Sequence, residues 1–176
     1  MTRFVVDAGA VLHLASAGIE VSSEHELLAP TLLRSQVLSA LHEAVQRGET
    51  RADVARDHLA LIGRMPIRLL GDAVLRRRAW DLADRLGWAS TYNAEYVALT
   101  QLQADALVTL DAELARSVEG IVATASIDAL RQEGESGRRA ALTKSDDRRR
   151  APTHITTVTI ATNEYRAKGQ GRPRRS

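Results

Sequence analysis

The sequence contains no cysteine and few aromatic residues. The lack of cysteine excludes disulfide bonds and thiolate zinc sites, and it is compatible with a reducing compartment. Aromatic residues make up only 3% of the chain and hydrophobic residues 44%, so a core must be built mainly from aliphatic side chains. No apolar run approaches the roughly 18 uncharged residues of a membrane span. The N-terminal apolar stretch carries Asp7, which argues against a signal peptide. We therefore expect a cytoplasmic protein with no membrane segment.

Positive charge is concentrated at the C-terminal end. The formal net charge is +2, but Lys and Arg are in excess only in residues 131–176, whereas residues 1–130 carry an excess of Asp and Glu. Residues 131–152 have few apolar side chains and cannot bury enough surface to offset chain entropy. The β-branched run 154–162 has the composition of a single strand. We expect one domain, residues 1–130, followed by a basic, disordered tail, residues 131–176.

Short apolar runs alternate with helical patterns through residues 1–130. Strands or short extended elements are predicted at residues 4–6, 24–28, 66–70, 106–110 and 121–124. Apolar residues at helical spacing predict helices at residues 11–17, 33–48, 51–62, 72–86, 93–103 and 112–116. This alternation indicates an α/β domain of three layers, with a central parallel sheet flanked by helices.

Two carboxylates stand at the ends of predicted strands. Asp7 follows the first strand and Asp111 follows the strand at residues 106–110. Ligands of parallel sheets bind outside the carboxyl ends of the strands, so both residues fall at the edge where a site is expected. Carboxylates at a cleft suit Mg²⁺, which a nuclease uses to activate water and to stabilise charge on a phosphate. The structural alternative for each residue alone is to cap the following helix.

Four short segments occur in order along the chain, at residues 4–12, 29–41, 90–99 and 104–111. They resemble the four acidic motifs of the PIN-domain family, and within that family those of the bacterial VapC-like toxins. The likeness extends over residues 3–125. It implies a three-layer PIN-like fold in which the four motifs meet at one metal site.

Two of the four acidic positions implied by this resemblance carry amides. Gln36 stands where the family has glutamate, and Asn93 stands where it has aspartate before Ala-x-Tyr. An amide oxygen can still ligate magnesium, but it brings no negative charge, so metal binding should weaken. The structural alternatives are a polar helix position for Gln36 and a helix N-cap for Asn93. Thr109, in the family's Thr-x-Asp motif, is either a hydroxyl that supports Asp111 or an ordinary β-branched strand residue.

Other acids near the motifs do not replace the missing charges. Glu95 is two positions from Asn93, so on a helix it points elsewhere. Glu43 lies two helical turns from Gln36. We expect Asp105 at the opposite edge of the sheet, and the sequence does not place Asp72.

The resemblance implies an endoribonuclease that cleaves RNA with Mg²⁺ or Mn²⁺ and acts as the toxin of a toxin–antitoxin pair. Asp7 and Asp111 would be the metal ligands, with Gln36 and Asn93 as neutral ligands or positioning groups. The same resemblance implies an antitoxin-like small protein as partner, and a homodimer. The basic runs at residues 148–150 and 172–175 could contact RNA phosphates, or they could form a solvated chain end.

Two other function classes remain open. The amides at positions 36 and 93 favour a catalytically silent PIN-like module that binds RNA or protein. A regulator with Asp7 as phosphoacceptor is the third alternative, but no paired acids precede Asp7 and no suitable lysine follows it.

Overall fold

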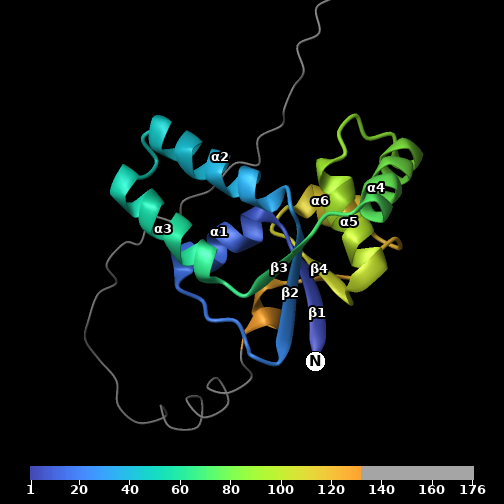
Figure 1. The fold of residues 1–176 in the computed structure, drawn as a ribbon, viewed down its shortest axis with the longest axis horizontal. Helices are drawn as coiled ribbons and strands as arrows, with labels where there is room; N and C mark the ends of the chain where they lie inside the picture. Colours follow the sequence, from blue (N-terminus) through green and yellow to red (C-terminus); the bar gives the residue numbers. More distant parts are fainter. Residues whose placement is uncertain (132–176) are drawn as a thin grey trace, which may run out of the picture.

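A computed structural model describes residues 1–131 of the chain (Figure 1). One sheet of five parallel strands has the order β3-β2-β1-β4-β5. The strands are β1 (Thr2–Val6), β2 (His25–Pro30), β3 (Ile67–Leu70), β4 (Ala106–Val108) and β5 (Thr124–Ala125). The helices are α1 (Ala8–Ala17), α2 (Leu33–Gln46), α3 (Ala52–Arg64), α4 (Ala73–Leu86), α5 (Tyr92–Gln103) and α6 (Ala112–Ser117), followed by a 3-10 turn, η1 (Ile127–Leu130).

The sheet is covered on both faces. Figure 1 shows α1, α2 and α3 on one side of the sheet and α4, α5 and α6 on the other. Because both faces of such strands are covered, their sequences are continuous apolar runs. Val5, Val6, Leu107 and Val108 are accordingly fully buried. The predicted α/β domain with a central parallel sheet flanked by helices is therefore confirmed.

Two predicted strands have different limits in the structure. The strand predicted at residues 106–110 ends at Val108, because the chain turns at Thr109. The last strand, predicted at residues 121–124, is shifted toward the C-terminus: β5 spans Thr124–Ala125, and the residues before it form a turn. Gly120 adopts a left-handed φ of 76° there, and the backbone N–H of Val122 donates to Val118. The apolar character of this segment therefore reflects packing of a turn.

The described chain ends against the domain. Leu130 is fully buried, and its carbonyl accepts a hydrogen bond of 2.9 Å from the backbone N–H of Ser22. The tail was predicted to begin at Arg131, but Arg131 still pairs with Val21 in an isolated antiparallel bridge. The rest of the predicted tail, including the strand predicted at residues 154–162, lies outside the described residues. Within residues 1–131, no helix is both long and apolar enough to cross a membrane.

Candidate functional site

The two aspartates lie side by side at the carboxyl edge of the sheet. Strands β1 and β4 are hydrogen-bonded neighbours with Val6 opposite Val108, and the backbone N–H of Asp7 donates to the Val108 carbonyl at 3.3 Å. Asp7 begins α1 and Asp111 begins α6. The sequence therefore predicted correctly that both carboxylates would reach the same edge.

Each aspartate also caps the helix that follows it. Oδ1 of Asp7 accepts a hydrogen bond of 2.7 Å from Ala10 N. Oδ1 of Asp111 accepts hydrogen bonds from Glu113 N at 2.8 Å and Leu114 N at 3.0 Å. Oδ2 of Asp111 makes no hydrogen bond within residues 1–131. Capping therefore fixes the orientation of both carboxylates and leaves this oxygen available to a ligand.

Thr109 joins the two aspartates. Its Oγ1 accepts a hydrogen bond of 3.0 Å from the backbone N–H of Asp111, and its side chain is also hydrogen-bonded to the Asp7 carboxylate. Because an ionised carboxylate can only accept, the Thr109 hydroxyl is the donor of this hydrogen bond. The hydroxyl thus lies between the backbone of one acid and the carboxylate of the other.

The environment of Asp7 disfavours its negative charge. Burial raises the pKa of Asp7 above its ordinary value of 3.8, and the nearby charge of Asp111 raises it further. Hydrogen bonds from Thr109 and from backbone N–H groups lower the same pKa and only partly offset burial. A cation beside the two carboxylates would relieve this repulsion.

Gln36 is held by a residue whose role the sequence did not predict. The hydroxyl of Tyr96, a buried residue of α5, donates a hydrogen bond of 2.6 Å to Oε1 of Gln36 in α2. Burial raises the pKa of Tyr96, and the negative charges of Asp7 and Glu95 raise it further, so the phenol stays neutral and remains a donor. Tyr96 therefore connects Gln36 to the surroundings of Asp7. Its position in the Ala-x-Tyr motif was the signal for this role.

Asn93 lies in the first turn of α5 and is exposed. The N-cap interpretation of Asn93 is wrong, because the helix begins at Tyr92 and Thr91 occupies the cap position. Asn93 and Tyr96 are three residues apart and therefore lie on one side of the helix. Within residues 1–131, no hydrogen bond joins Asn93 to Asp7, Asp111 or Gln36.

The other acids are engaged elsewhere. Asp72 caps α4, since its Oδ1 accepts from Leu75 N at 2.8 Å, and it follows β3, two strands away from β1. Asp105 lies at the opposite edge of the sheet, as expected, where its Oδ2 accepts from Arg3 N at 2.7 Å. Burial raises the pKa of Glu95, and Arg76 of α4 lowers it. The structure therefore adds no third carboxylate to the pair formed by Asp7 and Asp111.

The donors present fit a weakly held divalent cation. Within the described part of the chain, no group of three or more Asp, Glu, His or Cys side chains could hold a metal ion. Asp7 and Asp111 supply two hard, charged donors, and Mg²⁺ commonly keeps several waters on such a pair. Gln36 and Asn93 can add only neutral oxygens, and that of Gln36 is already engaged by Tyr96.

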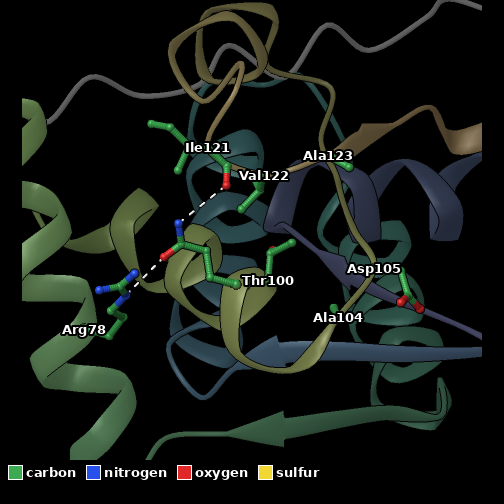
Figure 2. A pocket seen from close by; sticks show the side chains of 8 residues that line it. Arg78, Thr100, Ala104, Asp105, Ile121, Val122 and Ala123 are labelled. Atoms are coloured by element: carbon green, nitrogen blue, oxygen red, sulfur yellow. Dashed lines mark hydrogen bonds between the residues drawn. The ribbon is translucent and has the colours of Figure 1, made fainter.

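A hollow of about 390 Å³ lies away from this acidic pair. Its lining includes Arg78, Gln101 and Asp105, and none of the predicted site residues. Figure 2 shows the two hydrogen bonds that cross it: Arg78 Nε donates to Gln101 Oε1 at 3.1 Å, and Gln101 Nε2 donates to the Ile121 carbonyl at 3.5 Å. These bonds connect α4, α5 and the turn before β5. The polar side chains that line the hollow therefore serve to join these elements, and no ligand is needed to explain them.

No protein-family model matches the sequence, and no curated protein matches it. Solved structures do match. The chain is similar to PAE2754 from Pyrobaculum aerophilum, with 22% identity and a TM-score of 0.56 over 73% of this chain and 93% of that one. It is also similar to VapBC2 from Rickettsia felis, bound to a DNA fragment from its promoter, with 7% identity and a TM-score of 0.50 over 70% and 98% of the two chains.

A third match is Mycobacterium tuberculosis VapC20, a toxin that cleaves the sarcin-ricin loop, with 15% identity and a TM-score of 0.45 over 65% of this chain and 94% of that one. The first two likenesses, at low identity, concern the fold, and they confirm the PIN-like architecture that the four motifs predicted.

Proposed function

We propose that this PIN-like chain is a metal-dependent endoribonuclease of attenuated activity and the toxin of a toxin–antitoxin pair. The observation that supports this most directly is the pairing of Asp7 and Asp111 at the carboxyl edge of the sheet, where burial and mutual charge raise the pKa of Asp7. Two crowded carboxylates destabilise a fold unless something compensates for them, and a bound cation does so.

Each side chain at this edge has a role in the proposal. Asp7 and Asp111 hold Mg²⁺ or Mn²⁺, and the cation, when bound, supplies an activated water and neutralises charge on the phosphate. Thr109 supports both acids through its two hydrogen bonds and keeps the carboxylate of Asp7 in place. Gln36 is fixed by Tyr96, and Asn93 lies in the first turn of α5. Both side chains position the RNA or add weak neutral ligands to the cation.

The test combines metal titration with RNA cleavage. Wild-type protein should bind Mn²⁺ in the millimolar range and cleave single-stranded RNA slowly, and Asp7→Asn and Asp111→Asn should each lose both properties. Asp105→Asn is the matched control, because it makes the same chemical change at the opposite edge of the sheet. Retention of cleavage in both site variants would exclude the assigned roles.

A catalytically silent RNA- or protein-binding module is the second candidate. The engagement of Gln36 Oε1 by the Tyr96 hydroxyl favours it, because an oxygen already used as an acceptor is a poorer metal ligand. If wild-type protein binds RNA but neither metal nor cleavage is detected at millimolar Mn²⁺, the silent module is the better description.

We also propose an antitoxin-like small protein as partner. An apolar hollow of about 360 Å³ lies between α2 and α3, lined by residues that include Leu38, Leu41 and Leu59. Leu38 is 55% exposed, and Ala55 is the one buried residue of α3. Such a groove suits an apolar helix of a partner protein. Leu38→Lys should prevent capture of that partner, and Leu102→Lys, on exposed α5 surface, should not.

Self-association is a separate proposal. Trp80 on α4 is 63% exposed, and exposed aromatic residues are frequent in interfaces. We expect a homodimer at tens of micromolar protein, measured by light scattering. A monomer under these conditions would contradict the proposal.

A further inference from the structure

Two large apolar side chains are exposed in the segments that carry candidate site residues. Tyr92 is 55% exposed and directly precedes Asn93, and Leu110 is 52% exposed and directly precedes Asp111. Each therefore belongs to one of the segments that form the candidate site. An aromatic ring left in water beside such a site is available to a ligand.

Tyr92 lies on the same side of α5 as Tyr96. It is four residues before Tyr96, and residues four apart on a helix lie one above the other. Tyr96 contacts Gln36 through its hydroxyl. Tyr92 therefore lies one helical turn from this contact, at the N-terminal end of α5. The backbone N–H of Tyr92 donates to Ser90 Oγ at 3.3 Å, which helps to fix the start of the helix.

Leu110 is presented by a rigid turn. The hydrogen bond from Asp111 N to Thr109 Oγ1 spans it, and the capping bonds of Asp111 anchor the residue that follows. The backbone on the C-terminal side of Leu110 is therefore fixed, while its side chain is exposed. Tyr92 and Leu110 thus both lie at the carboxyl edge of the sheet, one at the start of α5 and the other in the bend after β4.

We propose that Tyr92, assisted by Leu110, stacks against an unpaired base of single-stranded RNA next to the phosphate held at the acidic pair. This inference rests on the proposed ribonuclease function and names the side chains that would hold a base of the RNA next to the phosphate. A base has a face that can stack on an aromatic ring only when it is free of its neighbours in a duplex. A protein partner is a poorer occupant here, because docking would bury two carboxylates without compensating charge.

The test uses single-stranded RNA of roughly 12 nucleotides with 2-aminopurine at successive positions. Binding is measured with Ca²⁺ in place of Mg²⁺, together with the quenching of 2-aminopurine that stacking on a ring produces. Tyr92→Ala should weaken binding by roughly 5- to 100-fold and remove the quenching at one position. Tyr92→Trp should preserve both, Leu110→Ala should have a smaller effect, and the same RNA in a duplex should bind weakly to all variants.

Leu102→Ala is the matched control, since it removes another exposed apolar side chain from the far end of the same helix. It should leave binding and quenching unchanged, and thermal midpoints establish that all variants fold. If Tyr92→Ala binds RNA as wild type does, or instead abolishes self-association, the inference is overturned. If wild-type protein still cleaves RNA in that case, the proposed function is retained although the inference about Tyr92 is not. If wild type neither binds nor cleaves RNA with Mn²⁺, the proposed function fails and the inference fails with it.

Discussion

The two edges of the same sheet use aspartate in different ways. At the amino edge, Asp105 accepts a hydrogen bond from Arg3 N through its side chain, and its own N–H donates to the Arg3 carbonyl at 2.8 Å. At the carboxyl edge, Asp7 and Asp111 also accept backbone hydrogen bonds, but there the negative charge of Asp111 also raises the pKa of Asp7. Acceptance of backbone hydrogen bonds is common to the aspartates of both edges, whereas among these three residues crowding of charge concerns Asp7 and Asp111. Crowding is therefore the better guide to a site.

The largest expected effect comes from restoring charge at the carboxyl edge. The double change Gln36→Glu and Asn93→Asp adds two carboxylates to Asp7 and Asp111. We expect affinity for Mn²⁺ to rise by roughly 10- to 100-fold, with a parallel rise in RNA cleavage. Without metal the variant should be less stable than wild type at neutral pH, and millimolar Mn²⁺ should narrow or reverse the difference. Calorimetric titration, cleavage assays and thermal unfolding measure these changes.

The control for this variant is Asp7→Asn in the same background, which should abolish both gains. A double variant that gains neither metal affinity nor cleavage would show that positions 36 and 93 do not belong to the site. Equal cleavage by wild type and double variant would show that the amides are adequate ligands.

A smaller effect is expected at the amino edge. Asp105→Ala removes the acceptor for Arg3 N and should lower the free energy of unfolding by about 1 kcal/mol, because this hydrogen bond is exposed. Metal affinity and RNA cleavage should not change. Chemical denaturation measures the change in the free energy of unfolding. A loss of metal binding in this variant would contradict the assignment of the metal site to the carboxyl edge.

Asp7→Asn should make stability depend differently on pH. The folded pKa of Asp7 is raised above its ordinary value of 3.8, so the folded state holds its proton more tightly than the unfolded state. The stability of wild type therefore falls as pH rises from about 3.8 through the folded pKa. Asparagine keeps the cap and does not titrate, so the variant should be more stable than metal-free wild type at pH 7 and should lose this advantage near pH 3.

Thermal unfolding across this pH range, with chelator present, measures the difference. Addition of Mn²⁺ should then stabilise wild type and leave Asp7→Asn unchanged. If Asp7→Asn is less stable than wild type at pH 7 without metal, the claim that the charges of Asp7 and Asp111 destabilise the metal-free fold is contradicted.

The smallest effect on stability is expected from removal of residues 132–176. Their sequence predicts little buried surface, so truncation after Arg131 should leave the thermal midpoint almost unchanged. Truncation after Ser126 is the contrasting case, because it also removes the buried Ile127 and Leu130 and should unfold the domain at a clearly lower temperature. If the arginines of the removed segment contact phosphates, the shorter chain should bind RNA with a weaker salt dependence.

The sequence predicted those features of the site that depend on local pattern. Apolar runs ending in Asp7 and Asp111 were enough to place two carboxylates at one edge of a parallel sheet. The Tyr96–Gln36 contact could not be predicted in this way, because its partners are 60 residues apart and meet only when α2 and α5 pack on the finished sheet. The N-cap interpretation of Asn93 failed by two residues, since hydrophobic spacing does not fix where a helix begins.

The same limit applies to the fold. Buried strands at the centre of the sheet were predicted because both of their faces are apolar. The strand expected at residues 121–124 was misplaced because Val118 and Val122 have the side chains of a strand but pack in a turn. Apolar composition predicts burial there, and only the backbone hydrogen bonds determine the conformation.

The hydrogen bond from Tyr96 to Gln36 also bears on how such a site can change by mutation. The phenol needs only an oxygen at the end of the side chain at position 36, and glutamate presents one as well as glutamine does. In the genetic code, glutamine and glutamate codons differ in the first base alone, and so do those of asparagine and aspartate. Two single-base substitutions therefore separate this site from one with four acids, and because Tyr96 retains its partner, the step at position 36 alters charge and leaves the packing intact.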